Sequence, residues 1–196
     1  MKILKVEQDT EAWHRLRSQY VTATEANRLK NQDNWEEMVK NKLKRVRTTF
    51  KNAAMIKGNE REPEARDTIN NVIGGNTEFR PMCVVDNTIG AMASLDGGEP
   101  SLSVILEIKC PEKDEKSDLY YKALEKKIPS QYRDQMQFQM MVTGAANAIY
   151  MVYAGDNKYQ IIMVNRDEIH IKMLKDLTIQ FWEYADNYIN DLKIAA

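Results

Sequence analysis

The sequence has 196 residues and is poor in the residues that many functional sites require, with two cysteines and two histidines. Two cysteines are too few for a disulfide framework, a four-cysteine zinc site or a cysteine-ligated iron–sulfur cluster. We therefore expect Cys83 and Cys110 to be buried thiols. Hydrolytic chemistry based on histidine would have to use His14 or His170, so carboxylates and lysine are the better candidates for catalytic groups.

Long apolar runs and an excess of one charge are also absent. No window approaches the roughly 18 consecutive apolar residues of a membrane span, and the start, MKILKVEQDTE, turns acidic before the apolar region of a signal peptide can form. We therefore expect a cytoplasmic protein with no membrane partner. The formal net charge of −1 excludes a uniformly basic nucleic-acid binder, but it leaves room for a local basic groove.

The composition is that of an ordinary globular protein, with 43% hydrophobic and 29% charged residues, which excludes disorder and low complexity. At roughly 150 residues per domain, the length predicts one domain over residues 1–196. The most basic stretch is residues 40–51, KNKLKRVRTTFK, which holds six basic and no acidic side chains. It is either a solvated helix face or a contact for a phosphate backbone, and charge alone does not decide between the two.

The hydrophobic pattern predicts helices and strands in a mixed order. Apolar residues at helical spacing lie within residues 9–50, 53–73, 117–127 and 130–143 and in a final helix around 173–188. Strand patterns lie at Phe79–Val85, Ile89–Ser94, Leu102–Lys109, Ala148–Tyr153 and Tyr159–Val164, with turn residues at Asp86-Asn87 and at Asp96-Gly97-Gly98. The fold class is therefore α/β, with a mixed central sheet of about five strands flanked by helices.

Two polar positions in the helical part are unusual. Thr24 opens a turn rich in alanine and glutamate and resembles a helix N-cap, where free N–H groups favour an anion. Extending the apolar stripe of Ala65 and Ile69 backward reaches Glu62, although Pro63 blurs the helical register. A carboxylate at the edge of an apolar stripe is costly unless a cation or donor meets it. Glu62 is therefore either a paired functional group or an ordinary surface residue.

The most informative segment is ASLDGG at 93–98, followed by ILEIKCP at 105–111. Alternate side chains of a strand share a face, so Glu107 and Lys109 point the same way. Burying them on an interior strand is costly unless each is paired or metal-bound, and Asp96 can sit beside them across a hairpin. Carboxylate oxygens suit Mg²⁺ or Mn²⁺, and a lysine can position a metal-bound water. The alternative is a half-exposed strand with an ordinary Glu–Lys pair.

The spacing D-x10-E-x-K of these residues resembles the acidic core of the PD-(D/E)XK nuclease superfamily. Five blocks, two of which contain these residues, follow one another in an order and spacing similar to the lambda-exonuclease and YqaJ-like viral recombinase family: WHRLR with VTAT (13–24), GNEREPEA (58–65), MASLDG (92–97), LEIKCP (106–111) and QYRDQMQFQMMVTG (131–144). The resemblance covers nearly the whole chain and implies a restriction-endonuclease-like core. Leu95 stands in place of the proline of the PD pair.

The same resemblance implies the roles of the acidic cluster. Glu62, Asp96 and Glu107 would hold one or two Mg²⁺ ions, for which Mn²⁺ can substitute. The backbone carbonyl of Ile108 would be a further ligand. Lys109 would orient the attacking water and help to deprotonate it, since charges in the site add to the effect of the ion on bound water.

The resemblance also implies contacts with DNA. Arg17, Thr24 and Ser94 look like a pocket for a terminal 5′-phosphate, in which a guanidinium supplies charge and hydroxyls supply neutral donors. Thr24 stands where family members commonly carry serine. Met55 takes the place of an apolar residue that would wedge the two DNA strands apart, with simple helix packing as the alternative.

Two residues of the last quoted block would border the active site. Tyr132 and Gln135 are three apart on a helix and so share a face. The resemblance implies that Gln135 would hydrogen-bond the scissile phosphate or the attacking water. The alternative is a helix surface that packs beside a methionine-rich core.

The implied activity is that of a Mg²⁺-dependent exonuclease that degrades linear double-stranded DNA in the 5′→3′ direction from 5′-phosphorylated ends. It would leave 3′ overhangs for phage-type recombination and would act in the host cytoplasm if a phage or prophage encodes it. A homotrimeric ring and a single-strand annealing recombinase as partner are further implications. The alternatives are a restriction or repair endonuclease of the same superfamily and a catalytically silent protein that binds DNA ends.

Overall fold

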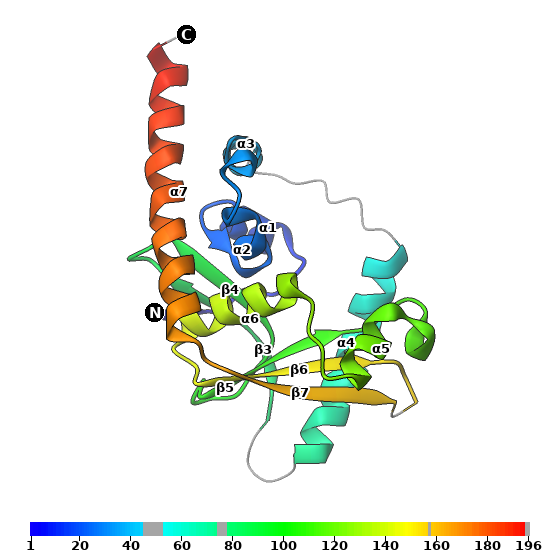
Figure 1. Cartoon of the computed structure of the whole chain (residues 1–196). Helices are drawn as coiled ribbons and strands as arrows, with labels where there is room; N and C mark the ends of the chain where they lie inside the picture. The colour runs from blue at the N-terminus through cyan, green and yellow to red at the C-terminus, as the bar shows by residue number, and fades with distance from the viewer. Residues whose placement is uncertain (45–52, 74–77, 157, 195–196) are drawn as a thin grey trace.

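The computed structural model describes residues 1–44, 53–73, 78–156 and 158–194, with the backbone alone for residues 53–55. In this part of the chain seven strands form one sheet in the order β1-β3-β4-β5-β6-β7, and β2 pairs with β4 (Figure 1). The strands are β1 Lys2–Leu4, β2 Val21–Thr22, β3 Arg80–Asp86, β4 Ala91–Gly98, β5 Val104–Lys109, β6 Asn147–Tyr153 and β7 Tyr159–Asn165. The β5–β6 and β2–β4 pairs are parallel and the others antiparallel, so the sheet is mixed.

Helices cover both faces of this sheet. The α-helices are α1 Glu11–Arg17, α2 Ala26–Leu29, α3 Trp35–Leu43, α4 Ala53–Ile73, α5 Asp118–Leu124, α6 Ser130–Thr143 and α7 Glu168–Ile194, and the short 3₁₀ turns are η1 Ala23–Glu25, η2 Gln32–Asn34 and η3 Asp114–Lys116. α4 lies behind the sheet and α6 in front of it, while α7 runs from the sheet edge past α3 (Figure 1). The α/β class expected from the sequence is confirmed.

The alternation of side chains along β5 divides the core between the two faces. Ile105 packs in the large cluster that contains the apolar side of α6, whereas Leu106 and Ile108 pack in a second cluster with Ala65 and Ile69 of α4. Because apolar residues of β5 are buried on both faces, the strand has no solvent side. Any charged residue on it must find partners inside the protein.

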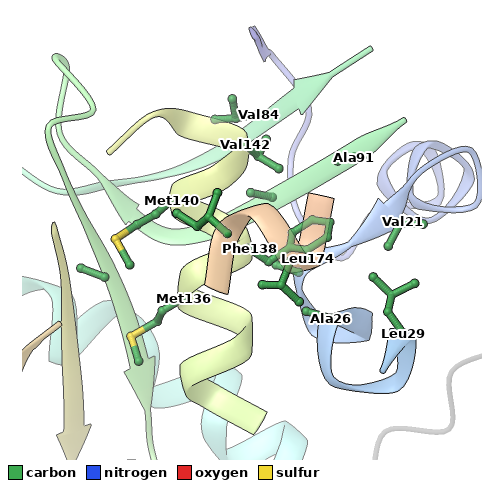
Figure 2. Close-up of a cluster of buried hydrophobic side chains, with 14 of the residues drawn as sticks. Val21, Ala26, Leu29, Val84, Ala91, Met136, Phe138, Met140, Val142 and Leu174 are labelled. Carbon is green, nitrogen blue, oxygen red and sulfur yellow. The ribbon is translucent and has the colours of Figure 1, made fainter. Parts of the chain in front are cut away.

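The large cluster is centred on α6, as Figure 2 shows. Met136, Phe138 and Met140 are fully buried and lie between the sheet and the shorter helices. Leu29 of α2 and Leu174 of α7 complete the cluster from the other side. This packing fixes the position of α6 relative to β5, which matters for the polar residues that α6 also carries.

The sheet differs from the expected one in its size and in one turn. It has seven strands rather than about five, because β1 and β2 are too short to give a pattern in the sequence. The turn expected at Asp96-Gly97-Gly98 is wrong, since these residues belong to β4 and pair with β5. A Cβ at Gly97 would lie 2.8 Å from that of Phe79, so this glycine permits close packing. The turn instead follows Glu99, whose carboxylate accepts hydrogen bonds from three of the next five residues.

In the ranges described above, no helix is both long enough and apolar enough to span a membrane.

We expect Phe138→Ala to lower the free energy of unfolding by about 3–5 kcal/mol, because the ring is fully buried in the cluster around α6. Ile169 is 86% exposed, and Ile169→Ala is the matched control, with an expected change within about 0.5 kcal/mol. Urea unfolding measures both. Equal effects of the two substitutions would contradict the placement of α6 against the core.

Candidate active site

A carboxylate sits at the centre of the sheet. Glu107 of β5 has no exposed surface, and its neighbours along the strand, Leu106 and Ile108, face the apolar layer under α4. The Glu107 side chain points to the α6 face, as does Lys109, which pairs with it. The sequence-based prediction that these two residues share a face is therefore confirmed.

Three donors hold the Glu107 carboxylate. Lys109 Nζ donates to Oε1, Gln135 Nε2 donates to the same oxygen at 2.7 Å, and Gln139 Nε2 donates to Oε2 at 2.6 Å. Charge-assisted hydrogen bonds of this kind are among the stronger ones in proteins. They offset the cost of burying the carboxylate, and two of the three come from α6.

Asp96 reaches the same place from β4. The two strands pair at Gly97–Leu106 and Gly98–Ile105, and beyond these pairs the side chain of Asp96 takes a hydrogen bond from the backbone N–H of Ile108 at 2.7 Å. Burial raises the pKa of the Asp96 carboxyl well above its usual range, and the charge of Glu107 raises it further.

Glu62 approaches from α4, which continues through Pro63. Arg66, one turn further along, pairs with the Glu62 carboxylate and donates from Nε to the backbone oxygen of Asp96 at 2.6 Å. Burial raises the pKa of Glu62; the positive charge of Arg66 opposes this rise and the negative charge of Glu107 adds to it. Glu62 is thus a paired residue at the cluster, which is one of the two alternatives that the sequence left open.

Lys109 is the cation at the centre of the cluster. Burial alone would lower its pKa, but the charges of Glu107 and Asp96 outweigh burial and raise it. Its Nζ lies 4.9 Å from the centre of the Tyr132 ring, which in turn stacks on Tyr150 at 5.9 Å. Tyr132 therefore borders the cluster, as expected, and contacts it through the lysine.

The charges in the cluster do not balance. Among the residues that the structure describes, the three carboxylates Glu62, Asp96 and Glu107 face two cations, Lys109 and Arg66, so the negative charges outnumber the positive ones by one when all are ionised. Burial is the main cause of the raised pKa of Asp96, and the negative charges of Glu107 and Glu62 add to it. Carboxylate oxygens are the ligands that Mg²⁺ and Mn²⁺ prefer, so the donor set and its charge fit a hard divalent cation.

Each of these carboxylates already has a partner within the protein. Glu62 pairs with Arg66, Glu107 with Lys109, and Asp96 with the Ile108 amide. Correspondingly, among the described side chains no three histidine, cysteine, aspartate or glutamate residues are arranged to hold a metal ion as they stand. Coordination through the oxygens that these cations contact, Glu62 Oε1 and Glu107 Oε1, would require Arg66 or Lys109 to move away.

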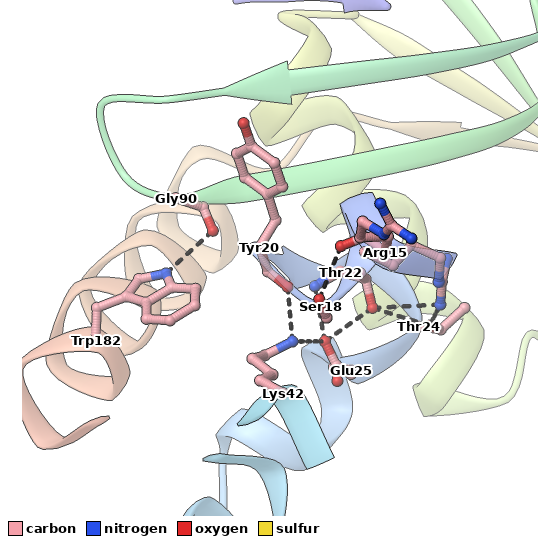
Figure 3. Close-up of polar contacts among 10 residues, drawn as sticks. Arg15, Ser18, Tyr20, Thr22, Thr24, Glu25, Lys42, Gly90 and Trp182 are labelled. Atoms are coloured by element: carbon pink, nitrogen blue, oxygen red, sulfur yellow. Dashed lines mark hydrogen bonds and ion pairs between the residues drawn. The ribbon is translucent and has the colours of Figure 1, made fainter. Parts of the chain in front are cut away.

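The residues expected to bind a 5′-phosphate gather near the C-terminal end of α1, where Arg17 lies. Arg17 Nη2 donates to Thr24 Oγ1 at 2.9 Å, so these two side chains meet (Figure 3 labels Thr24). Ser94 of β4 is connected to them through Trp13, whose Nε1 donates to Ser94 Oγ at 3.0 Å and whose ring lies 4.4 Å below the Arg17 guanidinium. The side chain of Met55 is outside the described residues.

A second buried carboxylate connects this pocket to α6. Asp134, which is 2% exposed, takes a hydrogen bond from Asn27 at 3.0 Å and pairs with Lys30 at 2.6 Å. Asn27 belongs to α2, which directly follows the turn η1 that contains Thr24, and Asp134 precedes Gln135. The pocket and the acidic cluster are therefore attached to the same helix.

The basic stretch at 40–51 falls only partly within the described residues. Lys40 pairs with Glu36 on the exposed side of α3, and Lys42 pairs with Glu25. These two basic side chains thus have partners in the protein. Residues 45–51 of the stretch lie outside the described part.

Sequence reasoning missed several residues of the site. Gln139 stands one helical turn after Gln135, and Arg66 one turn after Glu62, so helical spacing was the available signal. Glutamines alternating with the apolar residues Met136, Phe138 and Met140 were a second signal, because a buried amide needs a partner. The hydrogen bond from Trp13 to Ser94 depends on the packing of α1 against β4, which no local pattern shows.

Three solved structures resemble this one. Two are crystal structures of LHK-Exo, an alkaline exonuclease from Laribacter hongkongensis, one of them in complex with dAMP; both are 26% identical to this chain, cover 95% of it and 97% of their own length, and have TM-scores of 0.81 and 0.78. The third is a phage related exonuclease from Haemophilus somnus 129PT, 17% identical, with a TM-score of 0.67 over 88% of this chain and 96% of its own. This last one supports the fold alone.

Comparison with curated protein sequences gave no significant match. The family model described as "YqaJ-like viral recombinase domain" matches residues 12–146, a range that contains the acidic cluster and the Arg17–Thr24 pair. This match and the similarity to the alkaline exonuclease support a nuclease of that family. The chain belongs to the YqaJ-like viral recombinase family.

Proposed function

We propose that this protein is a Mg²⁺-dependent exonuclease that degrades linear double-stranded DNA from 5′-phosphorylated ends in the 5′→3′ direction. The observation that carries the proposal is the meeting of Asp96, Glu107 and Lys109 at one point of the sheet, with Glu62 beside them. The similarity to an alkaline exonuclease supports it.

The carboxylates would hold the cation, with the Ile108 carbonyl as a further ligand. A Mg²⁺ ion bound there would lower the pKa of a bound water and offset negative charge on the scissile phosphate. Released from Glu107, the Lys109 ammonium would orient the attacking water. Gln135 is 8% exposed and would turn its amide from Glu107 to the phosphate.

In the proposed reaction, a water oxygen forms a bond to phosphorus while the bond from phosphorus to the 3′-oxygen breaks in line. The water loses a proton and the departing 3′-oxygen gains one. Because water attacks the phosphorus directly, no covalent enzyme intermediate forms. The released nucleotide has a free 3′-hydroxyl, and the shortened strand keeps the phosphate at its new 5′ end. Arg17 and Thr24 would bind that new phosphate in the next cycle.

Assembly and partners are part of the same proposal. A homotrimeric ring would enclose the DNA, and the 3′ overhangs would pass to a single-strand annealing recombinase. The net charge of −1 is compatible with enclosure, which holds DNA with less positive charge than an open surface needs. The cytoplasm is the proposed location.

Comparing DNA ends tests the activity most simply. With Mg²⁺ we expect linear duplex with 5′-phosphate ends to be degraded about tenfold or more faster than the same duplex with 5′-hydroxyl ends, because the charged end gains hydrogen bonds from Arg17 and Thr24. Closed-circular DNA and all reactions with EDTA should show no degradation. Cleavage of the closed circle would instead favour an endonuclease, and no cleavage of any substrate would favour a silent end-binding protein.

Replacing the central lysine tests the chemistry. We expect Lys109→Ala to lower the cleavage rate by about 100-fold or more, because the group that orients the water is lost, while binding to 5′-phosphorylated ends is retained. Lys172→Ala is the control, since Lys172 lies on the exposed side of α7 and pairs with Asp176. Gel-based cleavage rates and fluorescence anisotropy of labelled duplex measure the two properties. An unchanged rate in Lys109→Ala would remove this residue from the mechanism.

A further inference from the structure

A chain of hydrogen bonds leads from the 5′-phosphate pocket into the protein. Arg17 donates to the hydroxyl of Thr24, and the hydroxyls of Thr24 and Thr22 are 3.1 Å apart. Thr22 is buried, and its Oγ1 donates to Glu25 Oε2 at 2.9 Å. Figure 3 shows this chain ending at Glu25 and Lys42.

Glu25 and Lys42 form a buried ion pair at the end of the chain. Glu25 is 7% exposed, and its Oε2 lies 2.9 Å from Lys42 Nζ. The same oxygen accepts the backbone N–H of Thr22 at 2.9 Å, while Lys42 also donates to the Tyr20 carbonyl at 2.6 Å. Burial raises the pKa of Glu25, but Lys42 and the other donors outweigh burial and lower it, so Glu25 is charged.

A charged carboxylate only accepts hydrogen bonds, and this sets the direction of the chain. The Thr22 hydroxyl directs its proton to Glu25 and therefore acts as an acceptor towards Thr24 and Arg17. The Arg17 guanidinium is then the charged donor for a phosphate, and the Thr24 hydroxyl becomes a second donor when it turns its proton from Thr22 to the phosphate. Glu25 thereby arranges the pocket, but its negative charge stands two hydrogen bonds away from Thr24.

An unbalanced negative charge at that distance would repel a phosphate, and because Glu25 is buried, water weakens this repulsion less than it weakens repulsion between two exposed charges. Lys42 supplies the balancing charge from α3. We propose that Lys42 is a specificity-determining residue: by neutralising Glu25 it lets the pocket of Arg17 and Thr24 select a 5′-phosphate over a 5′-hydroxyl. This inference rests on the proposed end-dependent exonuclease activity.

A purely structural role makes a different prediction. Thr22 and Glu25 have the spacing of a helix capping box, which accepts glutamate or glutamine at its third position. If the ion pair only stabilised this segment, replacing Lys42 would lower the stability and the rates on both kinds of DNA end alike, and the ratio of the two rates would stay at its wild-type value. If charge balance matters, removing the carboxylate as well should reverse the effect of losing the lysine.

The test measures kcat/KM for duplex with 5′-phosphate and with 5′-hydroxyl ends, and takes their ratio for each variant. We expect Lys42→Met to lower the ratio by about tenfold, which is the effect of one uncompensated nearby charge. The double variant Lys42→Met with Glu25→Gln should recover to within about threefold of wild type. Glu25→Gln alone should not lower the ratio. Lys40→Met, which removes the exposed pair with Glu36 on the same helix, is the matched control and should change nothing.

An unchanged ratio in Lys42→Met, or a double variant as impaired as the single one, overturns the inference. Thermal melting and the rate on 5′-hydroxyl ends report folding. If Lys42→Met does not fold, Glu25→Gln decides alone, because a lowered ratio there contradicts charge balance and an unchanged or raised ratio supports it. Arg17→Ala distinguishes failure of the proposed pocket from failure of the role of Lys42. A wild-type ratio in Arg17→Ala would contradict the pocket itself. A lowered ratio in Arg17→Ala together with a wild-type ratio in Lys42→Met would contradict only the role of Lys42.

Discussion

The arrangement of the site depends on one constraint, which is that a carboxylate is held without solvent on the central strand of an apolar sheet. Glu107 has no exposed surface, so its burial must be offset by donors inside the protein. Gln135 and Gln139 supply two of them from α6, and this requires α6 to pack with one particular face on β5. The same face carries Tyr132 against Lys109. The core packing of α6 and the polar site are therefore determined together.

Much of the fold follows from local patterns. The helix expected at 130–143 is α6 with the same bounds, and the strands expected at Ala148–Tyr153 and Tyr159–Val164 differ from β6 and β7 by one residue each. β1 and β2 were not predictable, because two or three residues have no period. They form because they pair with longer strands: Lys2 of β1 lies opposite Val85 of β3, and Val21 of β2 lies opposite Ala91 of β4. Gly97 was mistaken for a turn residue because the neighbour that demands a glycine, Phe79, comes from the chain before β3.

The centre of the site was more predictable than its surroundings. Alternation along one strand was enough to pair Glu107 with Lys109, and the motif spacing brought Asp96 to them. Helical spacing places Gln139 on the same face of α6 as Gln135. It does not identify Glu107 as its partner, because that contact depends on how α6 packs on β5. The Lys42–Glu25 pair joins residues 17 apart through the approach of α3 to η1. No periodic pattern encodes such a meeting.

The central claim is that the cluster around Glu107 is built to bind a divalent cation. Anomalous diffraction from crystals soaked in Mn²⁺ tests it most directly, since it needs neither substrate nor activity. The account predicts a manganese peak bound by oxygens of Asp96 and Glu107, with the Lys109 ammonium displaced from Glu107. Crystals that show the Lys109–Glu107 pair intact and no manganese between these carboxylates would contradict it.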